Sequence, residues 1–370
     1  MDCGRIPLKI LICLGAAVLA GIIIMGLNPR HSLFTNKVGR PADGAGIRFR
    51  KYGIAFTKPF DPVVPARPAE RPSFSVEIAF TSEHRRKNGF GLLFMFHDGD
   101  DASQFLMGQW HSRIVFMNGD DYDHSRKAPR IMADIAAAAS KAIVVTLVSG
   151  PGGTRLYMDG GLVLEKKGLK LTLPGGDRRP RLVLGNSVYG DNPWEGAVYG
   201  FAAYPHALTP ADVANHHGRW LKSRDFSFAM GEGTSLLYLF DETSGGESID
   251  RSGLGRHLET PAAVTVLKPR ILAFPPDKFR FSSNFIQDII INFIGFVPFG
   301  LVFTAILLRV RGLRVGYAMA ASVLLGFAVS LAIEIGQAWI PSRSSSLLDL
   351  LLNTGGAGSG AAVWGILCRK

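Results

Sequence analysis

Four long apolar runs dominate the hydropathy pattern of this chain. They cover Ile10–Leu27, Ile289–Leu308, Val315–Ile333 and Leu347–Cys368, and only the last contains a charge, Asp349. A bilayer core is crossed by about 20 helical residues, so each run is long enough to span it. We therefore expect four transmembrane helices, at residues 1–28 and about 285–308, 315–340 and 347–368. A cleaved signal peptide is the alternative for the first, but no small-residue cleavage site follows it before Asn28.

Between the first two runs the pattern changes to the alternation typical of β-strands. The expected strands, each bounded by Gly, Asp or Asn, are Phe74–Phe80, Gly91–His97, Gln104–Gly108, Arg113–Asn118, Ala142–Ser149 and Arg155–Met158. Asp159-Gly160 is a two-residue hairpin signal, because both central positions need positive φ. Many short strands at this spacing predict an all-β sandwich over residues 73–268.

Turn-rich segments flank the predicted sandwich. Residues 29–72 carry prolines at 59, 62, 65, 68 and 72, so we interpret them as a Pro-rich tether with one strand candidate at Gly46–Thr57. Residues 269–284 form the linker that returns the chain to the membrane.

Lys and Arg beside the apolar runs predict the orientation in the membrane. Arg5 and Lys9 precede the first run, three arginines separate the second and third, and Arg369-Lys370 close the sequence. With four spans all of these lie on one side. We therefore expect a multi-pass cell-membrane protein with cytoplasmic N- and C-termini and residues 29–284 outside.

Charge and cysteine usage narrow the function classes. The net charge is +11 and the pI about 9.7, but an exported domain with scattered basic residues does not indicate nucleic-acid binding. Anionic lipid headgroups or acidic envelope polymers are the expected electrostatic partners. Cys3, Cys13 and Cys368 all lie at or near the membrane, so no disulfide framework or Cys-based zinc site is expected in the exported domain.

The second half of the predicted sandwich carries a recognisable succession of motifs. A Tyr-x-Asp-Gly hairpin is followed by a strand ending in Leu184-Gly185, by Trp194-x-Gly196, and by Leu208-Thr209-Pro210 opening a short helix that Asp212 caps reciprocally. Over Ser73–Trp220 this resembles the laminin-G-like, concanavalin A-like jelly rolls, with a terminal strand that extends the domain to about Lys268. The resemblance implies recognition of carbohydrate or protein, here an envelope glycan or glycoprotein, in some relatives with calcium.

The expected exported domain contains acidic clusters and a histidine pair that are candidates for metal binding or catalysis. Calcium prefers several oxygen ligands from loops, and the candidates are Asp98, Asp100, Asp101, Asp120, Asp121 and Asp123. Aspartates between strands are also ordinary turn formers, which we favour, so no cofactor is assigned. No Glu-x-Asp-x-Glu pattern of a glycosidase occurs. For His216-His217 we expect a solvated helix end rather than a metal site.

Polar side chains occur in pairs at helical spacing in each of the last three expected spans. The pairs are Asp288 with Asn292, Glu334 with Gln337, and Asp349 with Asn353, so each pair shares one helix face. In the expected topology all lie within roughly 6–10 Å of the outer boundary, below Arg343 in the short loop. Ionisable residues inside a membrane are functional candidates, although amides also join helices. Gly356-x-x-x-Gly360 favours close helix packing, and Pro298 predicts a kink.

These motifs resemble the VanZ-like membrane family over about Phe281–Leu367. The residues that carry the resemblance are Asp288-x-x-x-Asn292-Phe-Ile-Gly-Phe-Val-Pro-Phe-Gly300, Glu334-x-x-Gln337 with Pro341 and Arg343, and Asp349-x-x-x-Asn353-Thr-x-Gly356. The sandwich would then be an insertion between the family's first and second spans. Relatives are associated with resistance to glycopeptide antibiotics of the teicoplanin type. Some relatives have an extra span that is missing here, so the helical bundle is expected to need a partner chain, either a second copy of this protein or another membrane protein.

Three functions remain open. The favoured one is a non-enzymatic envelope protein whose exported domain binds a glycan or glycoprotein and whose membrane module binds lipid or a lipid-linked group. In the alternative, the module is an enzyme on a lipid-linked precursor, with Glu334 as acid/base, Asp288 or Asp349 as its partner and Arg343 on a phosphate. An ion or proton path is weakest, because no ionisable residue continues toward the cytoplasmic half.

Overall fold

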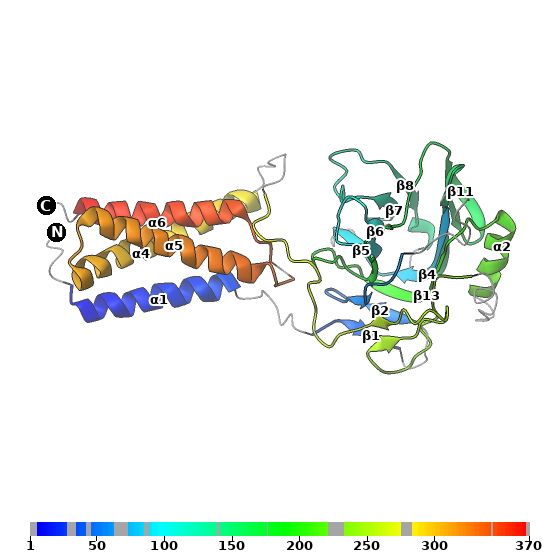
Figure 1. Ribbon diagram of the computed structural model, residues 1–370, viewed down its shortest axis with the longest axis horizontal. Helices are drawn as coiled ribbons and strands as arrows, with labels where there is room; N and C mark the ends of the chain where they lie inside the picture. The colour runs from blue at the N-terminus through cyan, green and yellow to red at the C-terminus, as the bar shows by residue number, and fades with distance from the viewer. Residues whose placement is uncertain are drawn as a thin grey trace. The chain divides into compact units, whose positions relative to one another are not determined.

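The structure is a computed structural model of the whole chain (Figure 1). It describes residues 6–27, 35–41, 46–62, 73–84, 89–138, 141–175, 177–220, 233–274, 283–341 and 343–367. The predicted features at Cys3, Arg5, Asn28, residues 63–72 and residues 368–370 lie outside these ranges. The chain divides into a helical unit, Met1–Ser32 with Pro269–Lys370, and a β-rich unit, Leu33–Lys268.

The β-rich unit is a sandwich of two antiparallel sheets, which confirms the predicted all-β architecture (Figure 1). The first sheet has the order β1 (Val38–Gly39), β2 (Ile47–Phe49), β13 (Gly196–Tyr204), β4 (Phe74–Ser82), β9 (Ile143–Gly150), β10 (Gly153–Met158) and β11 (Gly161–Lys166), with β14 (Leu236–Tyr238) paired to β13. The second has the order β15 (Glu247–Ser248), β16 (Leu258–Glu259), β3 (Ala55–Thr57), β12 (Arg181–Leu184), β5 (Phe90–His97), β6 (Phe105–Trp110), β7 (Arg113–Asn118) and β8 (Arg130–Asp134).

The main core lies between the two sheets and is rich in aromatic side chains. Phe94 contacts Phe105, Phe116 and Phe201 with ring centroids 5.2 to 6.2 Å apart, joining strands of both sheets. Separate clusters cover the outer faces. Trp220 and Val213 pack on the first sheet, and partly buried Val264 and Leu267 pack on the second. Strands buried on both faces explain why several central strands read as continuous apolar runs.

Local signals in the sequence predicted the hairpin and the short helix correctly. Asp159 and Gly160 both have positive φ between β10 and β11. The helix α2 (Pro210–Gly218) begins at Thr209, whose hydroxyl accepts from the backbone N–H of Asp212 while the Asp212 carboxylate accepts from Thr209. Figure 1 shows α2 beside the first sheet, and Val213 packs on the outer face of that sheet. These features depend on neighbouring residues, so the sequence alone suffices to find them.

Two local expectations are corrected. The single strand candidate at 46–57 consists of two strands, β2 in the first sheet and β3 in the second. The intervening Tyr52 has a positive φ of 71°, and the chain turns there to cross between sheets. This part of the predicted tether therefore belongs to the sandwich. The strand β8 was missed, because Arg130–Asp134 is short and follows a turn-rich segment.

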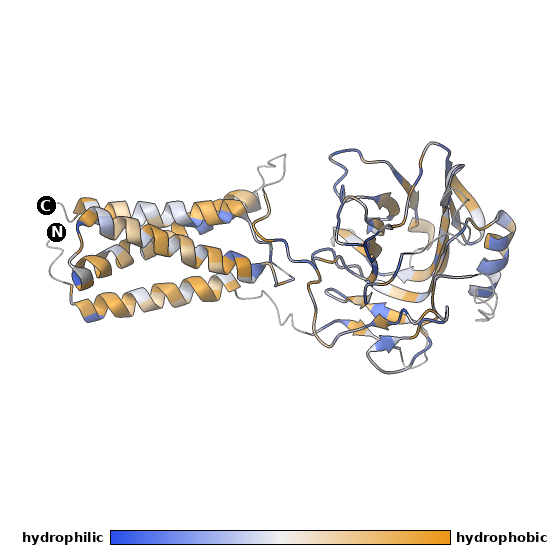
Figure 2. Cartoon of the chain, in the orientation of Figure 1, coloured by the Kyte–Doolittle hydropathy of each residue, from blue (hydrophilic) through white to orange (hydrophobic). Residues whose placement is uncertain are grey.

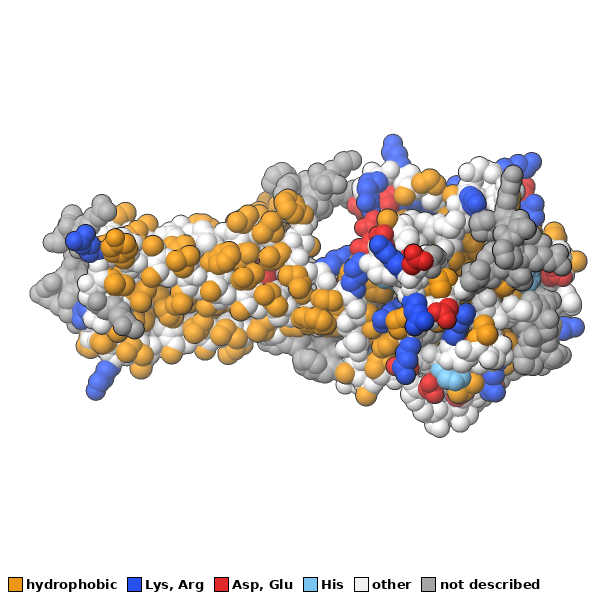
Figure 3. Space-filling model, viewed as in Figure 1, with side chains coloured by type: hydrophobic (Ala, Val, Ile, Leu, Met, Phe, Trp, Pro, Cys, Tyr) orange, Lys and Arg blue, Asp and Glu red, His pale blue; other side chains and the backbone are white. Residues whose placement is uncertain are grey.

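The helical unit contains α1 (Leu8–Leu27), α4 (Ser283–Arg311), α5 (Val315–Gln337) and α6 (Leu347–Leu367). Its core combines side chains from all four helices: Ile22, Phe296, Phe299, Ile333 and Ala357. The helices are mostly apolar (Figure 2), and the face of this unit seen in Figure 3 shows many hydrophobic side chains, with white atoms between them and few charged side chains. Among the residues that the structure describes, three segments are long and apolar enough to cross a membrane, Leu8–Leu27, Phe285–Val310 and Val315–Gln337, so this is a membrane protein.

Glycines bring α4 and α6 into backbone contact. A Cβ added at Gly300 would lie 1.8 Å from the carbonyl oxygen of Ala357, and one at Gly356 would lie 2.0 Å from that of Phe293. At Gly360 it would meet the carbonyl oxygen of Val297 at 2.0 Å. Only glycine permits such close approach, so the small-residue spacing serves helix packing, as predicted.

Candidate functional site

The polar pairs predicted in the membrane module come together at one end of the helical unit. This is the end where α1 and α5 finish and where α4 and α6 begin. Both chain termini are marked at the opposite end of this unit in Figure 1. Asp288 and Asn292 lie in the first turns of α4, Glu334 and Gln337 in the last turns of α5, and Asp349 and Asn353 in the first turns of α6.

Glu334 is the most buried carboxylate of this cluster, with 1% of its surface exposed. Its Oε2 accepts a hydrogen bond of 2.7 Å from the backbone N–H of Ser346 at the start of α6, and the Ser345 side chain also hydrogen-bonds the carboxylate. Ser345 in turn holds the linker through two hydrogen bonds. Its Oγ accepts from the backbone N–H of Leu272 at 2.9 Å, and its carbonyl oxygen accepts from the backbone N–H of Ala273 at 3.0 Å. Ser345 therefore connects the Glu334 carboxylate to the linker segment that precedes the membrane module.

Asp349 lies between the other two acids of the cluster. The Asn292 side chain forms a hydrogen bond with the Asp349 carboxylate. The charge of Asp349 interacts with that of Asp288 and with that of Glu334. Asp288 is exposed, whereas Asp349 is partly buried. Three acidic groups from three helices thus share one electrostatic environment, which favours bound groups that donate hydrogen bonds or carry positive charge.

Asn353 has an incomplete set of hydrogen bonds. Its Nδ2 donates to Ser330 Oγ at 2.9 Å, which joins α6 to α5. Its Oδ1 is buried and has no hydrogen-bond partner among the described residues. A buried amide oxygen without a donor is energetically unfavourable, so it is a position where a bound group can supply the missing hydrogen bond.

Gln337 and Arg343 lie against the end of α1. The Gln337 side-chain amide donates to the carbonyl of Gly26 at 2.9 Å, and Arg343 Nη2 donates to that of Met25 at 3.0 Å. The last carbonyls of a helix have no intrahelical donor, so these side chains complete the hydrogen bonding of α1. Both residues hold the first helix in the bundle beside the acidic cluster.

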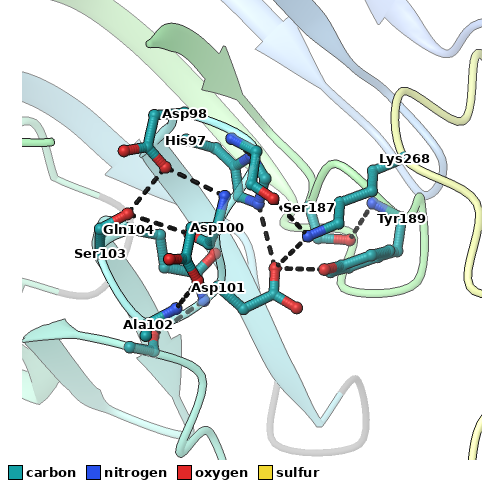
Figure 4. Close-up of polar contacts among 12 residues, drawn as sticks. His97, Asp98, Asp100, Asp101, Ala102, Ser103, Gln104, Ser187, Tyr189 and Lys268 are labelled. Carbon is teal, nitrogen blue, oxygen red and sulfur yellow. Dashed lines mark hydrogen bonds and ion pairs between the residues drawn. The ribbon is translucent and has the colours of Figure 1, made fainter. Parts of the chain in front are cut away.

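The aspartates considered for calcium have other partners in the sandwich. Asp98 Oδ1 accepts from the N–H of Asp100 and from Ser103 Oγ, and Asp100 accepts from the N–H of Ala102 (Figure 4). Asp120 pairs with Arg126, which follows the Asp123 turn. Within the described ranges, no group of three or more His, Cys, Asp or Glu side chains could hold a metal ion.

Asp121 is a buried structural anchor rather than a free oxygen ligand. It is 2% exposed and pairs with Arg130 at 2.6 Å, while the N–H groups of Arg126 and Ala128 donate to it. Burial opposes ionisation of this carboxyl, but the backbone donors and the Arg130 guanidinium outweigh it and hold its pKa below the usual value.

Asp101 organises the point where the sandwich ends. Its Oδ1 accepts from His97 Nε2 and Lys268 Nζ, each at 3.0 Å, and from the Tyr189 hydroxyl (Figure 4). Burial opposes ionisation of Asp101, yet these three hydrogen bonds prevail and hold its pKa well below the ordinary range. Lys268 Nζ also donates to the carbonyl of Gly99 at 2.8 Å. Lys268 is the last residue of the sandwich unit, so this cluster fixes its exit to the linker.

The expectation for His216 was wrong. His216 is fully buried, and its Nδ1 lies 3.0 Å from Oε2 of Glu77 in β4, which also accepts from Tyr204 and Trp220 at 3.0 Å each. Glu77 Oε1 accepts from Thr146 at 3.0 Å. This network fastens α2 to the first sheet. No local pattern predicts this network, because the partners of Glu77 are 69 to 143 residues away from it in the chain.

Comparisons with known proteins give a family match and several similar solved structures. Residues 253–368 match the VanZ/LLP1 family model, and a search of curated proteins gives no match. Among solved structures, the chain is similar to a candidate carbohydrate-binding protein from Bacteroides ovatus, with 16% identity over 63% of this chain and 62% of that one and a TM-score of 0.40.

Other similar structures are botulinum neurotoxin domains. The receptor-binding domain of the C/D mosaic serotype has 14% identity, covering 50% of this chain and 45% of that one, with a TM-score of 0.36. The binding domain of botulinum neurotoxin DC in complex with SialylT has 15% identity to this chain. The match covers 41% of this chain and 37% of that one, with a TM-score of 0.32. The chain therefore spans less than two thirds of each of these structures. The apolar helices at its C-terminal end, within the matched residues 253–368, are a VanZ-like membrane module.

Proposed function

We propose that this chain is a cell-envelope protein whose VanZ-like module binds a polar or lipid-linked envelope group at the outer leaflet, while its exported sandwich, a jelly roll, binds a glycan or glycoprotein. The observation that carries the proposal is the convergence of Glu334, Asp349 and Asn353 at one end of the helical unit. These oxygen-rich side chains match the hydroxyl and amine donors of envelope precursors.

The proposal includes four membrane spans, with both termini cytoplasmic. The α6 helix has 21 residues, which gives a length of about 31 Å, enough to cross a bilayer core. It is not among the three segments that are apolar enough to span by themselves, because Asp349, Asn353 and its glycines lower its hydropathy. Its Ala357 lies in the shared core of the bundle, and its backbone contacts α4. A helix packed in this way is supported by its neighbours rather than by its own hydropathy.

A membrane enzyme is the second candidate. Glu334 and Asp349 lie close enough for their charges to interact, and Glu334 is nearly enclosed. An enclosed carboxyl beside a second acid is a suitable arrangement for general acid/base chemistry on a lipid-linked precursor. We favour binding because the Glu334 carboxylate already accepts a backbone hydrogen bond, which accounts for part of its burial.

Substitution at Glu334 and Asn353 separates the two candidates. The chain would be expressed in a host susceptible to teicoplanin, and the shift in susceptibility would provide the readout for an envelope role. Glu334→Gln keeps the shape and an acceptor oxygen, so a binding site should retain most of the shift, whereas an acid/base enzyme should lose it. Asn353→Leu should weaken either function. Ser359→Ala is the matched control on α6, since its hydroxyl donates to the backbone carbonyl of Gly355. No shift with the unaltered chain would refute the link to glycopeptide resistance.

A further inference from the structure

A cleft opens at one end of the sandwich, where β4 and β6 end and β9 begins. Its volume is about 520 Å³, within the range of small-ligand pockets. The first sheet contributes Ser82 and Ile143, and the second contributes Gln109. The remaining lining residues come from the adjoining loops: His84, His111, Ser112, Ile135, Ala136, Ala138 and Lys141.

A buried, fully hydrogen-bonded glutamine forms part of the cleft wall. Gln109 is 2% exposed, and its Oε1 accepts from Ser82 Oγ at 2.7 Å and from Trp194 Nε1 at 2.9 Å. Its Nε2 donates to the carbonyl of His111 at 2.9 Å. Gln109 thereby links the two sheets and fixes the hairpin turn at the rim, so the cleft is preformed.

The rim presents an aromatic surface. His111 lines the cleft and stacks on Trp110, with ring centroids 4.7 Å apart and planes inclined by 26°. Trp110 is 52% exposed, although tryptophan is usually well buried. His111 has a φ of 56°, which turns the chain between β6 and β7 and sets this orientation. The Trp110 indole is not among the residues that line the cleft, and its stacking holds the His111 ring in one orientation at the rim.

His84 supplies a buried polar atom without a partner. It is 6% exposed, and its Nε2 lies 3.0 Å from the carbonyl oxygen of Gly89, so Nε2 must carry the hydrogen. Burial lowers the pKa of His84 and favours the neutral ring, in which Nδ1 is then an acceptor. This Nδ1 has no hydrogen-bond partner within the described part of the chain. The site therefore calls for a hydrogen-bond donor such as a hydroxyl.

We propose that this cleft is the glycan subsite of the sandwich and binds one saccharide unit, an inference that rests on the proposed function. The sugar ring stacks on the His111 imidazole at the rim and packs against Ile143, and its hydroxyls bond to polar groups of the cleft, including His84 and Lys141. Sugars combine flat C–H faces with many hydroxyl donors, which matches a cleft with a flat ring at its rim and an unsatisfied acceptor in its wall. A peptide would need a longer groove and paired backbone groups.

The test uses the full chain in lipid nanodiscs and an array of neutral, N-acetylated and uronate-containing oligosaccharides. The oligosaccharide that gives the strongest signal is then titrated by calorimetry. Lys141→Ala and His111→Gly, both at residues that line the cleft, should each weaken binding by about tenfold or more. Glycine accepts the positive φ at residue 111, so the second variant removes the imidazole without straining the turn. Leu254→Ala is the control, because Leu254 is 56% exposed and does not line the cleft; its affinity should be unchanged.

The outcomes separate this inference from the proposed function. Saturable binding that is retained in both cleft variants would show that the sandwich binds glycan at another place, and would overturn the subsite alone. Failure of the unaltered protein to bind any oligosaccharide on the array would overturn both the subsite and the glycan-binding function.

Discussion

The buried network around Glu77 makes a quantitative prediction about the stability of the sandwich. Glu77 is fully buried, and its carboxylate accepts hydrogen bonds of 3.0 Å from Thr146, Tyr204, His216 and Trp220. In Glu77→Gln, the side-chain oxygen can still accept from the three donors that contact Oε2, which are Tyr204, His216 and Trp220. The amide nitrogen can face the Thr146 hydroxyl, which also accepts. Only the charge is lost.

The expected cost follows from the strength of each hydrogen bond. A bond to a charged group contributes about 1.5–3 kcal/mol and a neutral one about 0.5–1.5 kcal/mol, so three bonds lose about 3 kcal/mol together. For a unit of this size, that lowers the melting temperature by roughly 6–12 °C. Glu77→Leu leaves all four donors without an acceptor and should cost more than about 4 kcal/mol.

The assay is urea unfolding of the full chain in nanodiscs, followed by tryptophan fluorescence. Trp220 donates directly to Glu77 and lies in the affected cluster. Glu83→Gln is the control, because Glu83 pairs with Arg48 on the surface, where the side chains are 43% and 41% exposed. Such pairs contribute about 0–1 kcal/mol. Stability of Glu77→Leu equal to that of the unaltered protein would refute the reasoning that the network holds α2 on the sheet.

Two further predictions concern the exit of the sandwich and the packing of the membrane module. Because the pKa of Asp101 is depressed in the folded state, its stabilising contribution is present at neutral pH and is lost as the pH falls below the ordinary aspartate value of about 3.9. Asp101→Asn should therefore lower the melting temperature at pH 7, and the difference should narrow below about pH 4; a difference independent of pH would contradict the assignment. Gly360→Ala should lower the thermal stability of the helical unit, since its Cβ would lie 2.0 Å from the carbonyl oxygen of Val297, whereas the control Gly358→Ala has no atom nearer than 3.9 Å. Equal melting temperatures of these two variants in nanodiscs would exclude the proposed α4–α6 contact.

The structure also changes how several polar residues are understood. Gln337 and Arg343 were expected to face a ligand, and their side chains bind the last carbonyls of α1. Glu334, Asp349 and Asn353 remain the candidate site. Lys268 had no assigned role, but it joins Asp101 and Gly99 and fixes the chain where it leaves the sandwich.

The sequence by itself determined the features that depend on local periodicity. Uninterrupted apolar runs predicted the helices of the membrane module, and period-two alternation with Asp159-Gly160 predicted the sandwich and its hairpin. The polar pairs at i, i+3 and i, i+4 could be placed on helix faces in the same way. Each of these signals lies within one element, where backbone geometry converts spacing directly into position.

Only the tertiary structure decided which distant residues meet. Residues 46–57 divide between two sheets, His216 is buried against Glu77 although they are 139 residues apart, and Lys268 meets Asp101 across 167 residues. The cleft behind His111 likewise exists because β4 and β6 end, and β9 begins, around the same place in the sandwich. Long-range contacts like these depend on the strand order and on the packing of the sheets, and neither can be predicted from the spacing of residues in the sequence.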